Sequence, residues 1–260
     1  MKRFLLILLI FNTILLPSFA ETIVGKVDKN IKNNSNQVID RTTLAPLKEV
    51  LIEVPSKHYR TRTDENGCFK LGTSINSPTI MSVKKEGYKP YSLTLERDFE
   101  SEPILIEIER TNANDIVIET DIIHLGDNYF SEHSANAGDF TIVSSGNSYS
   151  KIFDLRKMEY GENIYLNIGS IIGIDTLSAR NLRQTRVATT WASPPEIYFN
   201  GKKIAELKIN GDSQEIMLPR SLAKEGKRNE LTIKTGINQK KLNGLDYDDI
   251  EFTNLIIEVR

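Results

Sequence analysis

Apolar and polar residues alternate along most of this chain, in short stretches rich in Val, Ile, Thr, Tyr and Phe. A period of two places successive side chains on opposite faces and predicts β-strands. The clearest stretches are residues 22–27, 50–54, 80–84, 104–108, 116–120, 164–168, 196–199 and 231–234. Only residues 219–225 carry a helical pattern, about two turns long. The pattern therefore predicts an all-β chain with one short helical connector.

Short strands separated by turns are typical of antiparallel sandwiches and jelly rolls, and no strand–helix–strand alternation is present. Residues 110–115 are polar and lie between two strand-like stretches, which marks a domain boundary. We predict two antiparallel β-sandwich domains in tandem, at residues 21–109 and 116–260, with residues 110–115 as the linker. The Asn-rich stretch 30–37 predicts a long exposed loop in the first domain.

The first 20 residues have the parts of a signal peptide. Lys2 and Arg3 provide positive charge, residues 4–16 are almost entirely apolar, and a small-residue cleavage pattern ends at Ala20. The apolar stretch is shorter than the roughly 20 residues that a membrane-spanning helix needs. We therefore predict cleavage after Ala20, no transmembrane anchor in the mature chain, and export to the periplasm or the exterior. An uncleaved anchor is the alternative.

Charge and cysteine content narrow the choice of partners. The chain has 33 basic and 35 acidic side chains, for a formal net charge of −2, and the two signs are interspersed. Nucleic-acid binding requires a one-sided basic stripe, which this sequence lacks. The single cysteine, Cys68, has no partner for an intramolecular disulfide, so stability must come from hydrophobic cores.

Several segments of the first domain follow a recognisable order. A strand-like run at residues 46–54 precedes T-R-T-D-E-N-G-C-F at residues 61–69 and K-K-E-G-Y at residues 84–88. Together they resemble the carboxypeptidase regulatory-like domain, a transthyretin-like sandwich of about seven strands, over residues 21–108. The resemblance implies a spacer or attachment unit, and the chain has no His-x-x-Glu pair of a zinc peptidase. The loop at residues 29–45 is longer than the family pattern allows.

The second domain contains a different set of signals. Asn200-Gly201 separates two alternating stretches and is a strong hairpin signal. A Leu-Pro turn at residues 218–219, G-K-R-N-E-L-T-I at residues 226–233 and an acidic-to-apolar run at residues 246–255 follow it. In this order they resemble a galactose-binding-type jelly roll, similar to carbohydrate-binding modules and the sugar-binding domains of some glycosidases. The resemblance covers residues 116–260 and implies a carbohydrate ligand.

Acidic residues gather before the last strand of this domain. Asp246, Asp248, Asp249 and Glu251 offer the carboxylate oxygens that Ca²⁺ prefers. The same resemblance implies a structural Ca²⁺ between the last strand and an early one, where Asp121 would contribute. The alternative is a solvated turn in which Glu251 faces outward. No loop has the ligand spacing of an EF-hand.

A sugar site needs an aromatic face to stack on the ring and polar groups to hold its hydroxyls. The candidate aromatic side chains are those of Tyr129, Tyr149, Trp191 and Tyr247, and the candidate donors are Asn128, Arg183 and Arg186. From these we predict Tyr129, Trp191, Arg183 and Tyr247 as ligand-binding residues. For Trp191, the alternative is a place in the core.

Two other sets of residues suggest chemistry. Ser148-x-x-Lys151, Tyr165-x-Asn167 and Lys234-Thr235-Gly236 follow the order used by serine β-lactamases and penicillin-binding proteins, but Ser148 stands in a strand-like stretch rather than at the start of a helix. His124 and His133 with nearby acids suggest a metal, although the spacing lacks the short ligand pair of structural zinc sites.

The leading interpretation is therefore an exported, non-catalytic binding protein whose jelly roll recognises a carbohydrate or another cell-envelope component. The first alternative is a structural or assembly protein of the envelope that contacts only other proteins. The second alternative is a serine acyl enzyme or a hydrolase accessory.

Overall fold

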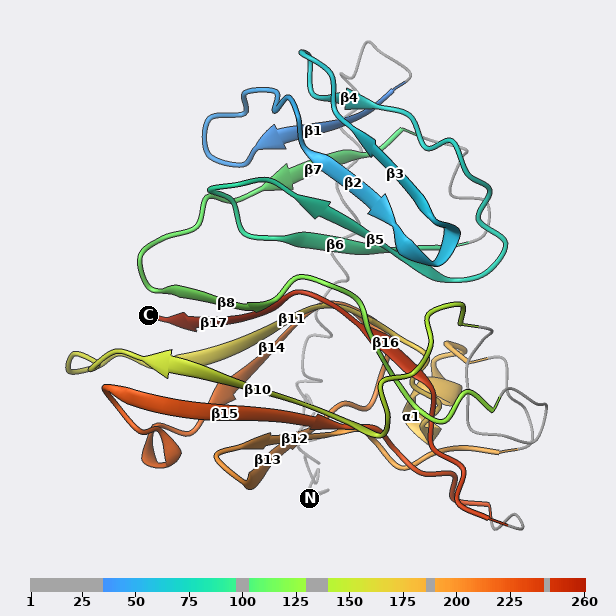
Figure 1. The fold of residues 1–260 in the computed structure, drawn as a ribbon, viewed down its shortest axis with the longest axis vertical. Helices are drawn as coiled ribbons and strands as arrows, with labels where there is room; N and C mark the ends of the chain where they lie inside the picture. The colour runs from blue at the N-terminus through green and yellow to red at the C-terminus, as the bar shows by residue number, and fades with distance from the viewer. Residues whose placement is uncertain (1–34, 97–102, 130–139, 186–189, 241–243) are drawn as a thin grey trace, which may run out of the picture.

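The computed structural model describes residues 35–96, 103–129, 140–185, 190–240 and 244–260. These residues form an all-β protein with one short α-helix (Figure 1), as the period-two pattern predicts. The predicted signal peptide at residues 1–20 and the strand at residues 22–27 lie outside the described residues. Within the described residues, no helix is long and apolar enough to cross a membrane.

Residues 36–108 form a sandwich of two sheets, the N-terminal sandwich. Its strands are β1 (Asn36–Asp40), β2 (Leu51–Val54), β3 (Tyr59–Arg62), β4 (Cys68–Phe69), β5 (Thr79–Lys84), β6 (Tyr91–Leu95) and β7 (Leu105–Ile108), with a 3-10 turn, η1 (Pro55–Lys57), between β2 and β3. One sheet has the order β4-β1-β7 and the other β3-β2-β5-β6. β1 and β7 pair in parallel, whereas the other pairs of this sandwich are antiparallel.

The prediction of a loop throughout residues 29–45 is wrong where β1 forms. Val38 and Ile39 are buried, and Val38 lies opposite Ile106 of β7. Only these two adjacent apolar residues mark the strand, and they are too few to reveal a period of two within an Asn-rich stretch. The core of the sandwich, rather than local pattern, therefore selects β1.

Residues 115–259 form the C-terminal sandwich. Its strands are β8 (Asp115–Glu119), β9 (Ile123–Leu125), β10 (Ser148–Leu155), β11 (Ile164–Ile172), β12 (Glu196–Phe199), β13 (Lys202–Glu206), β14 (Gly211–Leu218), β15 (Lys227–Lys234), β16 (Ile250–Phe252) and β17 (Leu255–Val259). The Asn200-Gly201 turn connects β12 to β13, as its sequence predicts.

The order of these strands is that of a jelly roll. In the first sheet, β8 and β9 lie along β17 and β16, which in turn lie along β11, and β14 pairs with the other edge of β11. The second sheet has the order β10-β15-β12-β13. β8 and β9 can be counted as one interrupted strand, and so can β16 and β17. With the strands numbered along the chain on this basis, one sheet has the order 1, 8, 3, 6 and faces a second sheet with the order 2, 7, 4, 5. This arrangement contains two Greek keys.

Helical structure differs from the prediction at two places. Residues 219–225 form only a 3-10 turn, η3 (Arg220–Leu222), and the α-helix α1 (Leu177–Asn181) lies elsewhere. α1 begins at Thr176, whose Oγ1 accepts a hydrogen bond from the backbone N–H of Ala179 at 3.1 Å. A five-residue helix is too short to produce a periodic pattern, so only its capping threonine marks it in the sequence.

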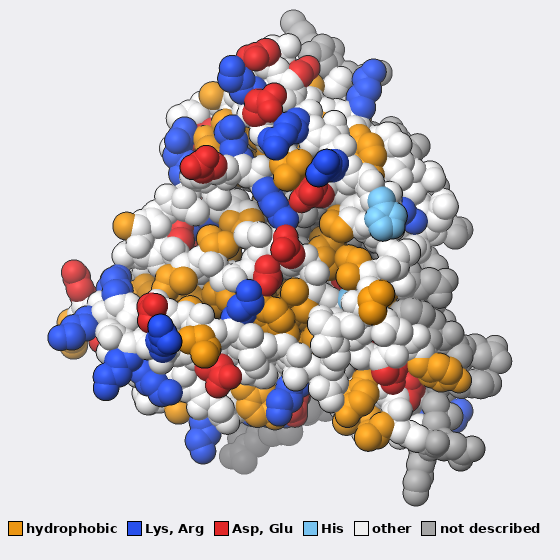
Figure 2. All heavy atoms as spheres, viewed as in Figure 1, with side chains coloured by type: hydrophobic (Ala, Val, Ile, Leu, Met, Phe, Trp, Pro, Cys, Tyr) orange, Lys and Arg blue, Asp and Glu red, His pale blue; other side chains and the backbone are white. Residues whose placement is uncertain are grey.

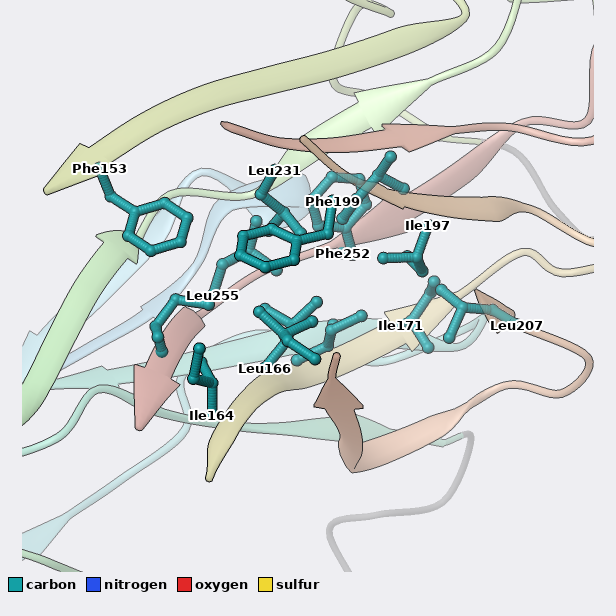
Figure 3. Close-up of a cluster of buried hydrophobic side chains, with 14 of the residues drawn as sticks. Phe153, Ile164, Leu166, Ile171, Ile197, Phe199, Leu207, Leu231, Phe252 and Leu255 are labelled. Carbon is teal, nitrogen blue, oxygen red and sulfur yellow. The ribbon is translucent and has the colours of Figure 1, made fainter. Parts of the chain in front are cut away.

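Each sandwich has its own hydrophobic core. In the C-terminal core, side chains from the two sheets meet between the layers (Figure 3): Leu166 and Phe252 come from one sheet, and Phe199 and Leu231 come from the other. The rings of Phe153 and Phe199 stack with their centroids 6.3 Å apart. Burial of these two separate clusters supplies the main free energy that holds each sandwich together.

The two sandwiches stack, so that four sheets lie in successive layers (Figure 1). Ile80, Ile172 and Ile256 are buried but belong to neither core, and they lie on the sheet faces where the sandwiches meet. The Oγ of Ser92 in β6 accepts a hydrogen bond from the backbone N–H of Ser170 in β11 at 2.8 Å. The sheets approach so closely that a Cβ on Gly169 would lie 2.4 Å from Ser92 Oγ.

Polar contacts extend this interface toward both of its edges. The backbone N–H and hydroxyl of Thr94 donate to the carboxylate of Asp212, at 3.1 and 2.8 Å. Lys89 Nζ lies 2.6 Å from Glu258 and 3.5 Å from Asp115. Directional contacts of this kind fix the orientation of one sandwich relative to the other.

Candidate functional site

The loops at one end of the C-terminal sandwich meet in a single region, which we call the loop end. Because neighbouring strands are antiparallel, the chain leaves β9, β11, β13 and β15 at this end and enters β10, β12, β14 and β16 from it. The loop end comprises residues 126–129, 140–147, 173–185, 190–195, 207–210, 235–240 and 244–249. In Figure 1 it surrounds α1 on the right of the molecule.

Asp127 joins two of the predicted aromatic residues. Its Oδ1 accepts a hydrogen bond from the backbone N–H of Tyr129 at 3.0 Å, and its Oδ2 accepts one from the backbone N–H of Tyr247 at 2.9 Å. The Tyr129 side chain is 56% exposed, and Tyr247 is half-buried. One carboxylate therefore holds two loops, far apart in sequence, with their tyrosines at the same place.

Trp191 lies on the neighbouring loop and is half-buried. Its exposure is therefore intermediate between that expected of an exposed stacking residue and that expected of a core residue. The guanidinium carbon of Arg180 lies 5.7 Å from the Trp191 ring centroid, which is within cation–π range. The backbone carbonyl of Trp191 accepts a hydrogen bond from Gln239 N–H. Asn238, the residue before Gln239, donates its backbone N–H to the carbonyl of Asp246, the residue before Tyr247. These contacts connect Trp191 to the loop that carries Tyr247.

The predicted donors fall in the same region, except for one that lies outside the described residues. Arg183 follows α1, is exposed and has a φ of 59°. Asn128 has a φ of 61° and donates its backbone N–H to Asp249 Oδ1 at 3.0 Å. Arg186, the third predicted donor, lies outside the described residues. The structure thus brings Tyr129, Trp191, Arg183 and Tyr247 to one end of the sandwich.

Tyr149, the remaining aromatic candidate, lies away from the loop end. It belongs to β10, its hydroxyl donates to Glu119 Oε2 at 2.6 Å, and its ring contacts that of Phe252 edge-on. Tyr149 is therefore part of the packing between the two sheets.

Four carboxyl groups are buried beneath the loop end: those of Asp175, Asp246, Asp248 and Asp249. Asp248 Oδ2 accepts a hydrogen bond from the backbone N–H of Asp175 at 3.2 Å, and Asp248 Oδ1 has no hydrogen-bond partner among the described residues. Burial, followed by the nearby charge of Asp175, raises the pKa of Asp248 well above its ordinary value. Burial thus favours the neutral acid form of Asp248 over its carboxylate.

His124 and Asp249 form a buried pair. The backbone carbonyl of Ile142 can only accept, so the His124 Nδ1 that contacts it carries a proton, and His124 Nε2 lies 2.8 Å from Asp249 Oδ1. Hydrogen bonding to Asp249 raises the pKa of His124, although burial opposes this effect. Both ring nitrogens thus have oxygen partners, which favours the imidazolium form.

Glu251 lies directly opposite His124 in the pairing of β16 with β9. The alternative in which Glu251 faces outward is wrong, because Glu251 is only 1% exposed. On the same face of the sheet, His124 contacts the ring of Phe140 and the carbonyl of Ile142. Neither carboxylate oxygen of Glu251 has a hydrogen-bond partner among the described residues. Burial raises the pKa of Glu251 to about 7, against the opposing charge of His124.

The predicted calcium ligands do not assemble. The Asp121 side chain is 79% exposed and pairs with Lys84 at 3.1 Å, whereas Asp246, Asp248 and Asp249 are buried beneath the loop end. Asp249 Oδ1 is already hydrogen-bonded to His124 and to Asn128. Among the described residues, no group of three or more His, Cys, Asp or Glu side chains is arranged to hold a metal ion. The donor set therefore does not fit Ca²⁺.

The serine motif falls on a regular strand. Ser148 in β10 lies directly opposite Lys234 in β15, and Lys234 Nζ lies 4.5 Å from the ring centroid of Tyr198. Lys151 Nζ lies 3.2 Å from Glu119 Oε2. Ser148, Lys151 and Lys234 are all exposed, so this arrangement does not resemble the enclosed serine of an acyl enzyme. His133, of the other motif, lies outside the described residues.

Sequence reasoning considered Asp127 only as one of the acids near His124 and His133, and it missed the structural role of three residues that organise the loop end: Asp127, Asp175 and Arg180. Asp127 had a detectable signal, because Gly126-Asp127-Asn128 after a strand is a turn sequence. Asp175 and Arg180 had none, since each acts on residues that are distant in sequence.

No protein-family model matches this sequence, and a search of curated proteins finds no match to it.

Proposed function

We propose that this chain is an exported, non-catalytic binding protein that recognises a carbohydrate of the cell envelope through the loop end of its C-terminal sandwich. The observation that carries the proposal is the convergence of Tyr129, Trp191, Arg183 and Tyr247 on that end. Asp127 and the backbone of residues 238 and 246 tie the loops that bear three of these residues together.

The chemistry of these residues suits a sugar. The apolar face of a pyranose ring stacks on an aromatic ring, and its hydroxyls accept hydrogen bonds from planar donors such as guanidinium. Tyr129 offers an exposed ring, and Arg183 offers an exposed guanidinium beside α1. Loops that are already fixed by hydrogen bonds lose little entropy when a ligand binds.

The N-terminal sandwich supports this function as a spacer of fixed orientation. The Thr94–Asp212 and Lys89–Glu258 contacts hold it against the first sheet of the jelly roll, away from the loop end. Export rests on the predicted signal peptide at residues 1–20, and the resemblances to a carboxypeptidase regulatory-like domain and a galactose-binding-type jelly roll support the same function.

The test is a glycan-array screen of residues 21–260, followed by titration of each bound glycan into variants. Trp191→Ala and Tyr129→Ala should each weaken binding about tenfold or more, since the loss of a stacked ring removes a large apolar contact. Tyr198→Ala is the control, because Tyr198 lies in β12 of the second sheet, outside the loop end. The proposal fails if no glycan binds, or if Tyr198→Ala weakens binding as much as the loop-end variants do.

A negative array combined with co-purification of envelope proteins would favour the structural alternative. In that case the two sandwiches would contact other proteins.

A further inference from the structure

The loop end carries a concentration of exposed aliphatic side chains that sugar stacking does not explain. Among the described residues, twelve large apolar side chains are exposed, and six of these are aliphatic residues of the loop end: Val143, Leu177, Leu182, Ile209, Ile237 and Leu245. Exposed apolar side chains gathered in one region mark an interaction surface. Figure 2 shows hydrophobic side chains at the lower right of the molecule, where the loop end lies.

Hydrogen bonds connect the loops that bear these residues. Leu177 is the first residue of α1 and Leu182 follows its last residue. Gln184, just after α1, exchanges hydrogen bonds with Asn210, the neighbour of Ile209. Ile237 pairs with Tyr247, two residues from Leu245. The Val143 loop is attached to Asn128 through the backbone N–H of Ser144.

The charges of the loop end are separated by depth. Its exposed or half-exposed charged residues in the described ranges are four cations, Arg180, Arg183, Lys208 and Lys240, and one anion, Asp127. The other described carboxyl groups of these loops are buried. The surface therefore presents aliphatic side chains among cations, which is complementary to an anionic surface with an apolar interior.

A lipid bilayer with anionic headgroups has this combination. Aliphatic side chains enter the boundary between headgroups and acyl chains, while nearby Lys and Arg side chains pair with lipid phosphates. The six apolar side chains of the loop end stand on four different connections between strands rather than on one sheet face. A fluid lipid surface adapts to such an arrangement, whereas a protein partner would need a rigid complementary shape.

We propose that the loop end docks on a lipid surface rich in anionic phospholipid, with its aliphatic residues inserted and its cations at the headgroups. Docking of this kind goes beyond sugar recognition and does not depend on it. It would hold Tyr129, Trp191 and Tyr247 at the membrane surface, next to any carbohydrate attached there.

The test is co-sedimentation of residues 21–260 with vesicles. Wild-type protein should sediment with vesicles of equal parts phosphatidylcholine and phosphatidylglycerol and not with phosphatidylcholine alone. The double variant Leu182→Asp/Leu245→Asp should lose at least about tenfold in binding, because two inserted side chains become charged. Arg183→Glu/Lys240→Glu should bind more weakly and respond less to salt.

The matched control is Ile152→Asp/Met217→Asp, which changes two equally exposed residues, 65% and 62% exposed, on strands outside the loop end. It should sediment like wild type, and circular dichroism should show that every variant is folded. Absence of wild-type binding to anionic vesicles would overturn the proposal, as would equal binding by the Leu182/Leu245 variant.

Two further readouts distinguish a lipid surface from a second copy of the chain and from a sugar. If the wild type is a dimer on gel filtration and Leu182→Asp/Leu245→Asp is a monomer, the surface binds a second copy of the chain and the lipid proposal fails. Sugar binding that survives in Leu182→Asp/Leu245→Asp while vesicle binding is lost would uphold both proposals separately. Vesicle binding without any glycan ligand would uphold lipid docking and reject sugar recognition.

Discussion

Asp40 in the N-terminal sandwich and Glu251 in the C-terminal sandwich are buried to the same extent, at 1% exposed each. Asp40 accepts hydrogen bonds from the backbone of Thr42 and Thr43, each at 2.9 Å, and from the Tyr88 hydroxyl at 2.8 Å. Arg110 Nε donates a further bond to Asp40, at 3.0 Å. Glu251 has no hydrogen-bond partner within the described part of the chain. Burial alone therefore does not decide whether an acid is charged.

The two acids respond to pH in opposite ways. The backbone N–H of Thr43 and then the hydroxyl of Tyr88 hold the pKa of Asp40 well below its ordinary value of 3.8. Asp40 thus contributes stability above that value, and the contribution is lost as the pH falls. Burial raises the pKa of Glu251 from 4.5 to about 7, so folding becomes less favourable as the pH rises between these values. The ionised Asp40 stabilises the N-terminal sandwich, whereas burial of Glu251 makes the C-terminal sandwich less stable as the pH rises.

Replacement of Asp40 should produce the largest effect. Asp40→Ala leaves four donors without their acceptor, and the melting temperature should fall by about 10 °C at pH 7. Thermal unfolding followed by circular dichroism measures the change. Asp154→Ala is the control, because its side chain is 84% exposed and lies 3.9 Å from Arg228. If the two variants melt alike, the Asp40 network does not stabilise the fold.

Glu251→Gln tests the opposite case. In the wild type, the free energy of unfolding should fall by about 3 kcal/mol between pH 4.5 and pH 7 through Glu251, because the folded state holds its proton more tightly. Glu251→Gln should remove this part of the pH dependence, as measured by urea unfolding at several pH values. The exposed Glu230→Gln in β15 should leave the dependence unchanged. Identical profiles for wild type and Glu251→Gln would show that Glu251 is solvated.

Asp248→Asn extends the comparison to a second buried acid. Asp248 resembles Glu251, since burial raises its pKa and one oxygen lacks a hydrogen-bond partner among the described residues. The amide cannot ionise, so the variant should lose the pH dependence that Asp248 contributes and should gain stability relative to wild type as the pH rises from 4 to 8. Urea unfolding at both values measures this. A loss of stability relative to wild type over the same range would mean that the ionised Asp248 carboxylate is stabilising.

The all-β class could be predicted because a period of two is a local signal, and residues 196–199 become β12 without a change of bounds. β1 could not, since Val38 and Ile39 are selected by the core rather than by a repeating pattern. Residues 219–225 look helical locally, but only η3 forms there. Tertiary contacts override propensity where a segment is short.

The candidate site shows the same limit. Tyr129 and Tyr247 could be chosen because they stand in turn-rich stretches, which loops place at the surface. Their shared partner Asp127, and the exposed position of Asp121 far from Asp248, depend on which loops meet. Charge identity is visible in a sequence, but the environment that decides protonation is not.

The close approach at Gly169 has a thermodynamic consequence. Ser92 fills the space that a side chain at residue 169 would need, so the facing sheets lie in close contact. Ile80 and Ile256 are buried between these sheets, and separation of the sheets would expose both side chains to water. Each sandwich then gains part of its stability from the other. Heat should therefore melt the two cores as one cooperative unit, with a single calorimetric transition rather than two.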